Sequence, residues 1–338
     1  MANILDQQYR ALVVTKQPNR HFHIDIENKQ LASLPNEDVL IKVAFSRINY
    51  KDIQSCLGNP AITRRFPHTP GLDAVGVVVK SRSKELVAGD RVVVVCSPMG
   101  MNSPGGFGQF VCVPSCWVTK LPDTMSLEHA MAYGTAGFTA ALAINEIEKQ
   151  SLDKERGVLV TGATGGVGSI AICLLKHLGY RVIASYSDID AKEWLESMGV
   201  DVFFERDALI TETAPNLLKQ QWGAAIDIAG GTVLSNILKQ TDDGGVVIAL
   251  GLMASTQFST NILPFILRGV SLIGINAEST LQNERSKLWQ KLAVDWCPKN
   301  LNNTFQTIGL DELPKMIELM QTAKPMGSVV VKLDKSYE

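Results

Sequence analysis

The chain has 338 residues, of which 46% are hydrophobic and 20% are charged, and it carries a formal net charge of -2 at pH 7. A chain of this length usually folds around more than one hydrophobic core, so we expect two domains. The composition offers no surplus of cations to neutralise a phosphate backbone, which argues against a nucleic-acid-binding function.

Membrane insertion and secretion are not expected either. No apolar run approaches the roughly 20 residues that a membrane-spanning helix requires. The N-terminal segment contains Asp6 and Arg10 and lacks the apolar stretch of a signal peptide. The 6 cysteines are irregularly spaced. We therefore expect reduced thiols in a cytoplasmic protein.

The first part of the chain is rich in β-type segments. Val, Ile and aromatic residues are concentrated in runs of strand length, and Pro, Gly, Asn and Asp separate these runs. The predicted strands are residues 9–15, 38–45, 74–80, 91–96 and 109–113. This pattern predicts a small barrel-like antiparallel domain over residues 1–125.

From residue 126 onward, helices alternate with strands. Residues 126–148 have apolar residues at helical spacing, with Ser126 as the predicted N-cap. Gly179 and Gly199 are predicted to end two of the later helices. The later helices are predicted at 167–178, 191–198 and 233–240, and the strands at 157–161, 181–185, 224–228 and 245–250. Alternation over this length predicts a parallel doubly wound sheet, a Rossmann domain spanning residues 126–270.

The last part of the chain again mixes element types. Residues 283–295 and 311–322 have helical patterns, and residues 328–333 form a predicted closing strand. A strand that follows the Rossmann domain can return to the first domain. We therefore expect residues 271–338 to complete the domain that residues 1–125 begin.

A glycine-rich turn joins the strand at 157–161 to the helix that follows. Its glycines at 162, 165 and 168 have the spacing G-x-x-G-x-x-G instead of the stricter G-x-G-x-x-G, whose first position is held by Ala163. The physical effect is the same, because a tight turn lets the backbone approach a pyrophosphate and the helix N-terminus supplies amide donors. The residues predicted to bind a dinucleotide here are Gly162, Thr164, Gly165, Gly166, Val167 and Gly168, together with Leu250 and Gly251 where a later strand ends.

The end of the second Rossmann strand bears on the choice of cofactor. Sites for NAD usually carry an acidic residue at this point, whereas this strand ends in small hydroxyl residues and Asp188 comes later. Ser185 and Ser187 are predicted to bind a 2′-phosphate, with Lys192 as the cation. NADP(H) is therefore the predicted cofactor and NAD(H) the alternative. Asp188 has a structural alternative as the cap of the next helix.

Several further motifs occur in order along nearly the whole chain. They are Ser46-Arg-Ile-Asn-Tyr-Lys-Asp52, Pro70-Gly-Leu-Asp-Ala-Val-Gly76, Gly89-Asp-Arg-Val92, Gly134-Thr-Ala-Gly-Phe-Thr-Ala140 and Pro264-Phe-Ile-Leu-Arg268. Together with the glycine turn, they resemble the medium-chain dehydrogenase/reductases of the zinc-free quinone-oxidoreductase branch, and within it the acrylyl-CoA reductase-like proteins. The resemblance implies an α/β protein with a GroES-like catalytic domain beside the Rossmann domain, assembled as a homodimer.

The zinc enzymes of this superfamily have metal ligands that this sequence lacks. They carry a Cys in the segment that corresponds to Asn49–Asp52 and a His-Glu pair after Pro-Gly, where this chain has Leu72 and Asp73. A neutral amide and an aliphatic side chain do not replace thiolate and imidazole as ligands. The cysteine-rich lobe of the structural zinc is also missing, so we expect no zinc.

The resemblance also places residues around the nicotinamide and the substrate. Asn49 is the predicted polar anchor, Tyr50 a wall or proton-transfer residue, and Lys51 an electrostatic contributor. The structural alternatives are a helix cap for Asn49 and an ion pair between Lys51 and Asp52. Thr135 is predicted to bond the nicotinamide carboxamide, with ordinary helix capping as its alternative.

Three arginines are candidates for the phosphates of a CoA ester or of the cofactor. They are Arg64, Arg65 and Arg268, and the guanidinium group suits such oxyanions. Two positions depart from the acrylyl-CoA reductase-like pattern. Asp188 and Ser328 stand where many of these proteins have arginine, which weakens the case for a tight 2′-phosphate site and for one particular substrate.

The predicted function is NADPH-dependent, zinc-independent reduction of an activated C=C bond. The leading substrate is a short 2-enoyl-CoA such as acrylyl-CoA, which the resemblance alone implies. Without a metal, charge that develops on the substrate carbonyl as an enolate needs hydrogen-bond donors. The alternatives are an NADPH:quinone oxidoreductase and a non-catalytic nucleotide-binding protein on the same scaffold.

Overall fold

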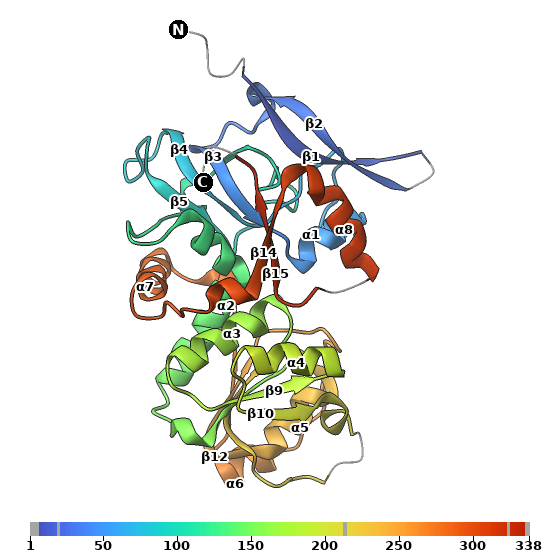
Figure 1. Ribbon diagram of the computed structural model, residues 1–338, viewed down its shortest axis with the longest axis vertical. Coiled ribbons are helices and arrows are strands. Elements are labelled where there is room, and N and C mark those ends of the chain that lie inside the picture. Colours follow the sequence, from blue (N-terminus) through green and yellow to red (C-terminus); the bar gives the residue numbers. More distant parts are fainter. Residues whose placement is uncertain (1–6, 19–20, 212–214, 323–324, 335–338) are drawn as a thin grey trace. The chain divides into compact units, whose positions relative to one another are not determined.

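The computed structural model describes residues 7–18, 21–211, 215–322 and 325–334 (Figure 1). The chain divides into two compact units. A β-rich unit comprises Met1–Thr135, Thr280–Val294 and Phe305–Glu338, and a parallel-sheet unit comprises Ala136–Ser279 and Asp295–Thr304.

The sequence predicted domain boundaries after residues 125 and 270. The observed division differs from this prediction at both boundaries. Helix α2 (Leu127–Glu148) continues across residue 135, so its first turns belong to the β-rich unit. Residues 271–279 belong to the parallel-sheet unit, because β13 (Ser271–Gly274) is the last strand of its sheet.

The main sheet of the β-rich unit has the strand order β14-β15-β3-β4-β5-β7, and β6 pairs with β3. The pair of β14 with β15 is parallel and the other pairs are antiparallel. The strands are β3 (Val39–Arg47), β4 (Ala74–Ser81), β5 (Arg91–Val94), β6 (Phe110–Val113), β7 (Val118–Lys120), β14 (Phe305–Gly309) and β15 (Ser328–Lys332). Because β15 pairs with β3, the C-terminal tail completes the sheet that the N-terminal part begins.

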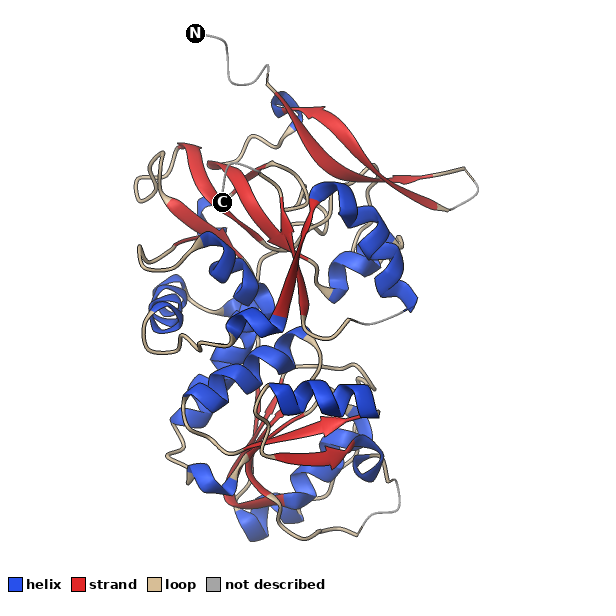
Figure 2. Cartoon of the chain, in the orientation of Figure 1, coloured by secondary structure: helices blue, strands red, loops and turns tan. Residues whose placement is uncertain are grey.

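A separate hairpin and three helices accompany this sheet (Figure 2). The hairpin pairs β1 (Gln8–Lys16) with β2 (Phe22–Gln30), and the helices are α1 (Tyr50–Cys56), α7 (Gln282–Ala293) and α8 (Leu313–Thr322). Strand β2 was not predicted, because its apolar residues alternate with charged and polar ones and its side chains are half-buried at best.

The core of the β-rich unit follows the two-residue period of its strands. Val39, Ile41 and Val43 of β3 and Val92 and Val94 of β5 are fully buried in one apolar cluster. Successive side chains of a strand point to opposite faces, so these alternate residues cover one face of the sheet. Residues of α8 complete the same cluster.

The parallel-sheet unit has six strands in the order β10-β9-β8-β11-β12-β13, all parallel. They are β8 (Val158–Val160), β9 (Val182–Tyr186), β10 (Val202–Glu205), β11 (Trp222–Asp227), β12 (Thr241–Ala249) and β13. Numbered within the unit, this is the order 3-2-1-4-5-6 of a Rossmann sheet. The predicted fold class is confirmed, and the order reverses between β8 and β11, where such sheets bind dinucleotides.

Helices flank this sheet as expected for right-handed crossover connections (Figure 1). They are α3 (Gly166–His177), α4 (Ile189–Ser197), α5 (Gly231–Gln240) and α6 (Leu263–Arg268). Gly179 and Gly199 follow α3 and α4 with φ of 79° and 81°, which confirms their predicted role at helix ends. Within the part of the chain that the structure describes, no helix is long and apolar enough to cross a membrane.

Candidate functional site

The glycine turn lies between β8 and α3, at the reversal of the strand order. Gly162 has a φ of 58°, a conformation that favours glycine, and Gly165 is the N-cap of α3. A Cβ on Gly168 would lie 2.3 Å from the carbonyl oxygen of Gly162. The first turn of α3 is therefore pressed against the turn that precedes it. No acidic residue lies in that first turn, so the amide groups and dipole of α3 favour an anion.

The loops that follow β8 and β11 are joined by a buried carboxylate, Asp227. It accepts hydrogen bonds from Thr161 Oγ1 at 2.8 Å and from the N–H groups of Gly230 at 2.8 Å and Ala229 at 3.2 Å. Burial raises the pKa of Asp227, and these hydrogen bonds oppose the shift. The sequence analysis missed this residue. Its available signal was an acidic residue at the end of an apolar strand, three positions before a glycine pair.

Leu250 and Gly251 lie beside the same loops. The N–H of Leu250 donates to the carbonyl of Asp227 at 3.0 Å. A Cβ on Gly251 would lie 2.2 Å from the carbonyl oxygen of Ile228, and a Cβ on Gly162 would lie 3.2 Å from Ile228 Cβ. The glycine turn and Gly251, just after β12, thus both pack against Ile228.

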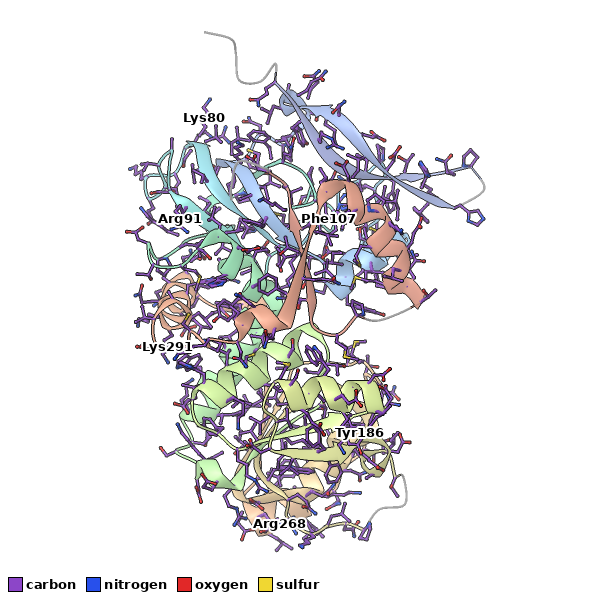
Figure 3. All side chains as sticks on the ribbon, in the orientation of Figure 1. Lys80, Arg91, Phe107, Tyr186, Arg268 and Lys291 are labelled. Carbon is purple, nitrogen blue, oxygen red and sulfur yellow. The ribbon has the colours of Figure 1, made fainter. Side chains whose placement is uncertain are left out.

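The end of β9 has a different arrangement around Asp188. Asp188 caps α4 by accepting the N–H of Ala191 at 2.9 Å, and its second oxygen accepts the Ser187 hydroxyl at 2.7 Å. These bonds lower the pKa of Asp188. Ser185 is buried in β9. Lys192 Nζ lies 5.5 Å from the centre of the Phe203 ring and 6.0 Å from that of Tyr186, which Figure 3 labels.

In the β-rich unit, predicted residues meet around a second buried carboxylate, Asp73. It is fully buried and accepts hydrogen bonds from the Thr135 N–H at 2.8 Å, the Thr135 hydroxyl, and Asn49 Nδ2 at 3.0 Å. Burial raises the pKa of Asp73, while these bonds and the charge of Arg47 oppose the shift. The sequence analysis noted Asp73 only because it stands where the zinc enzymes have the Glu of their His-Glu pair. Its contacts with Thr135 and Asn49 were not predicted.

Arg47 is a second residue that the sequence analysis did not assign to the site. Its guanidinium is fully buried and donates to the carbonyls of Ala132 and Tyr133 and to the hydroxyl of Ser328. Burial lowers the pKa of Arg47 to about 10, although the negative charge of Asp73 acts in the opposite direction. The two carbonyls come directly before Gly134, whose φ of 50° and ψ of -155° interrupt α2. Arg47 therefore caps the first segment of this helix.

Asn49, Tyr50 and Lys51 lie at the start of α1. Asn49 is the N-cap of this helix, and its N–H donates to Asp52 Oδ2 at 2.8 Å. The buried carboxylate of Asp52 also accepts the N–H groups of Gly71 at 3.1 Å and Leu72 at 2.9 Å. Burial nevertheless raises the pKa of Asp52 to about 8. Tyr50 and Lys51 are exposed, so α1 presents both to solvent.

The three candidate arginines do not form one group. Arg64 and Arg65 are exposed in the β-rich unit, and Arg64 Nε donates to the Pro60 carbonyl at 3.2 Å. Arg268, at the end of α6, is labelled in Figure 3 and lies in the parallel-sheet unit. Its guanidinium donates to the carbonyls of Lys239 and Leu218, both at 2.7 Å, and of Thr241 at 3.3 Å. Arg268 therefore holds together the segments around α5.

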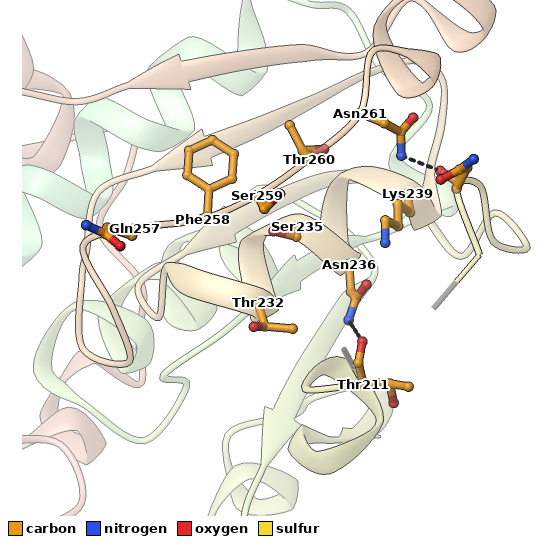
Figure 4. A pocket seen from close by; sticks show the side chains of 11 residues that line it. Thr211, Thr232, Ser235, Asn236, Lys239, Gln257, Phe258, Ser259, Thr260 and Asn261 are labelled. Carbon is orange, nitrogen blue, oxygen red and sulfur yellow. Dashed lines mark hydrogen bonds between the residues drawn. The ribbon is translucent and has the colours of Figure 1, made fainter. Parts of the chain in front are cut away.

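A hollow of about 570 Å³ lies elsewhere in the parallel-sheet unit (Figure 4). Hydroxyl and amide side chains from α5 and from residues 257–261 dominate its lining. Asn236 Nδ2 donates across it to the carbonyls of Leu209 and Thr211, at 3.0 and 2.9 Å. None of the residues predicted from the sequence lines it. We do not count it as part of the site.

The donor groups near Asn49 do not fit a zinc ion. The Asn49 amide is bonded to Asp73, and Leu72 is a buried aliphatic side chain. In the described ranges of the chain, no three His, Cys, Asp or Glu side chains are grouped so that they hold a metal.

Comparison with known proteins adds two family matches. Residues 35–123 match the model of the alcohol dehydrogenase GroES-like domain, and residues 166–294 match that of the zinc-binding dehydrogenase. The second description names a metal, but the zinc ligands of that family are absent from the positions discussed above.

Among characterised sequences, two relatives align over most of their length. The "Putative quinone oxidoreductase YhfP" of Bacillus subtilis is 38% identical over 92% of this chain and 94% of its own. The acrylyl-CoA reductase AcuI of Ruegeria pomeroyi is 34% identical over 96% of this chain and 99% of its own. Both are oxidoreductases by name.

Two solved structures have the same fold. The YhdH oxidoreductase of Salmonella enterica in complex with NADP is 33% identical, covers 96% of this chain and 100% of its own, and superposes with a TM-score of 0.91. YhfP of Bacillus subtilis with NAD bound is 36% identical, covers 97% and 100%, and gives a TM-score of 0.92.

Proposed function

This chain belongs to the medium-chain dehydrogenase/reductase superfamily, and we propose that it is a zinc-independent reductase of activated C=C bonds that uses NADPH. The proposal depends most on one observation. Gly162 of the turn and Gly251 both lie against Ile228, and Gly168 lies against the carbonyl oxygen of Gly162, so a side chain at Gly168 or Gly251 would clash with backbone atoms. Such a turn leaves backbone amides facing an anionic ligand.

The residues of the parallel-sheet unit fit a dinucleotide. When bound, NADPH supplies the hydride. Gly162, Gly165 and Gly168 bring the backbone close to the pyrophosphate, and the N-terminus of α3 stabilises its charge. Thr164, Gly166 and Val167 belong to the same turn and first helical residues.

The end of β9 favours NADPH over NADH. Both oxygens of Asp188 are already engaged, one with the Ala191 N–H and one with the Ser187 hydroxyl. These bonds give Asp188 a structural role as the cap of α4, so we do not assign it to a ribose 2′-hydroxyl, the usual partner of an acidic residue here. We assign the cation for a 2′-phosphate to Lys192, on the first turn of α4. Of the two neighbouring hydroxyls, Ser185 is buried and Ser187 donates its proton to Asp188, so each has to reorient before it can bond the phosphate. One relative of known structure binds NADP and another binds NAD, so NADH is the alternative.

In the β-rich unit we assign Thr135 and Asn49 to the nicotinamide and substrate. Asp73 holds both side chains from a fully buried position. Tyr50 is 57% exposed on the first turn of α1, where it can line the substrate path or pass a proton to the substrate. Lys51 adds a positive charge beside it. Charge that develops on the substrate carbonyl as an enolate is stabilised by such donors without a metal.

The proposed substrate is a short 2-enoyl-CoA such as acrylyl-CoA. The exposed pair Arg64 and Arg65 offers two guanidinium groups to CoA phosphates. We assign no phosphate to Arg268, because its guanidinium is occupied by three carbonyl groups. The superfamily resemblance also implies a homodimer, which light scattering of the purified protein tests.

The test is cofactor oxidation, followed by absorbance, with acrylyl-CoA or simple quinones at equal concentrations and with NADPH or NADH in parallel. We expect oxidation with acrylyl-CoA and NADPH. Oxidation mainly with NADH would keep the reductase and reject the cofactor choice. No oxidation with any enoyl-CoA or enone would reject the proposed reaction.

A quinone reductase is the second candidate, because the relative with 38% identity is named as one. Faster turnover of quinones than of acrylyl-CoA in the same assay would favour it. Cofactor binding without turnover of any of these substrates would favour a non-catalytic nucleotide-binding protein.

A further inference from the structure

A second hollow of the parallel-sheet unit, of about 390 Å³, lies at the edge of the sheet where β8, β11 and β12 begin. The glycine turn follows the other end of β8. Since all strands of this sheet run in the same direction, the hollow and the glycine turn lie at opposite edges of it. The residues that line the hollow include Leu152, Asp153, Arg156, Gln220, Asp242 and Asp243.

Asp242 lines this hollow with a side chain whose two oxygens have different surroundings. The residue is 5% exposed, and its Oδ2 accepts both Nε and Nη2 of Arg156 at 2.7 Å. Its Oδ1 is buried and meets no hydrogen-bond donor in the part of the chain that the structure describes. A buried acceptor without a donor is costly, and a bound ion or molecule is a usual explanation for it. The hollow is the side from which a ligand can donate to this oxygen.

The lining of the hollow also has an excess of negative charge. Among its described residues, Asp153, Asp242 and Asp243 are carboxylates, and Arg156 is the cation, which Asp242 already engages. Asp243 Oδ1 accepts Gln220 Nε2 at 2.7 Å, and Asp153 Oδ1 accepts a backbone N–H at 3.0 Å. Both of these donors are uncharged. A ligand of this hollow is therefore expected to be a cation.

An organic ammonium group fits this lining better than a metal ion does. Over the described ranges, no three His, Cys, Asp or Glu side chains are grouped so that they hold a metal. An ammonium group brings three N–H donors and needs no such shell of oxygen ligands. Leu152 adds an aliphatic side chain to the lining, against which methylene groups can pack. A volume of this size is in the range of small-molecule sites.

We propose that this hollow binds a small aliphatic polyamine, with one ammonium group donating to Asp242 Oδ1 and another attracted by Asp153 and Asp243. The site goes beyond the proposed reductase function and does not depend on it. A water molecule could donate to Asp242 Oδ1, but it would leave the charges of the other two carboxylates without a counterion. Because the amine binds the folded protein, it should also raise Tm.

The experiment titrates the full chain with spermidine by calorimetry at fixed ionic strength and without a dinucleotide. We expect saturable binding. Asp242→Asn should raise the Kd for spermidine about 10-fold or more, the value of one hydrogen bond to a charged group. Asp243→Asn is exposed, so it is expected to fold even if Asp242→Asn does not, and it should raise this Kd about 3-fold. Arg156→Gln removes the cation that competes for Asp242 and should lower the Kd by at least about 3-fold.

Asp207→Asn is the matched control. Asp207 is an exposed aspartate of the same unit that does not line the hollow, and its carboxylate lies 3.9 Å from Arg206 Nε. Its Kd should equal that of the wild type. Equal weakening in Asp207→Asn and Asp243→Asn would overturn the inference, and so would an unchanged Kd in Arg156→Gln. Absence of saturable binding, or tighter binding of Mg²⁺ than of spermidine, would overturn it as well. None of these outcomes depends on NADPH, so they are separate from the test of the proposed function.

Discussion

Gly168 offers the most direct test of the dinucleotide site, through the substitution Gly168→Ala. The added Cβ would lie 2.3 Å from the Gly162 carbonyl oxygen and 2.7 Å from Ala163 Cα, both backbone atoms that cannot rotate away. Either the turn or α3 has to move, at an expected cost of roughly 1–3 kcal/mol for overpacking. If the shift removes one amide–phosphate hydrogen bond, worth about 1.5–3 kcal/mol, the Kd for NADPH rises roughly 10- to 100-fold.

The assay for Gly168→Ala is fluorescence titration of NADPH, with the thermal unfolding midpoint Tm recorded for each variant. Gly274→Ala is the matched control, because a Cβ on Gly274 meets nothing within 4 Å. We expect the control to bind NADPH as the wild type does. Unchanged NADPH affinity in Gly168→Ala would refute the reasoning, because the turn would then not be the place where the cofactor is held.

Three further predictions concern Lys192, Asp52 and Arg47. Lys192→Ala should raise KM for NADPH by about 3- to 10-fold and leave KM for NADH unchanged; equal changes would remove Lys192 from the 2′-phosphate site. Burial raises the pKa of Asp52 from 3.8 to about 8, so its stabilising contribution is full below pH 3.8 and is lost as pH rises through about 8. Tm of the wild type relative to Asp52→Asn should therefore fall over that range, and a constant difference would contradict the raised pKa. Arg47→Met should lower Tm by roughly 6 °C or more, because two buried carbonyls lose their donor. The exposed Arg82, which bonds Asn36, is the control, and Arg82→Met should lower Tm by less than about 2 °C. Equal losses would contradict the capping role of Arg47.

The sequence predicted the parallel sheet well because its strands are apolar at nearly every position. Trp222–Asp227 and Val158–Val160 are buried throughout, and such runs between helical segments are typical of a sheet covered on both faces. The strands it missed lie at the edges of sheets. Strands β10 and β13 have only 4 residues each, and polar residues interrupt β14, so each offers only a short apolar run.

The site itself was predictable only where it is local in sequence. The glycine turn lies within one short segment, and the spacing of its glycines indicates the geometry of the turn. The cluster around Asp73 is different, because Asn49 and Thr135 are 24 and 62 residues away from it. Arg47 and Ser328 are 281 residues apart. Contacts of this kind depend on strand pairing, here that of β15 with β3, and no local pattern encodes them.

The buried carboxylates of Asp73 and Asp227 share one hydrogen-bonding scheme. Thr161 Oγ1 accepts the N–H of Ile228 at 2.9 Å and donates to Asp227, just as Thr135 Oγ1 accepts the N–H of Cys96 and donates to Asp73. In each unit the carboxylate thereby fixes a threonine hydroxyl against a neighbouring loop. The conformational entropy of these loops is therefore lost when the protein folds and not when a ligand binds. A ligand that binds these loops therefore does not have to order them first.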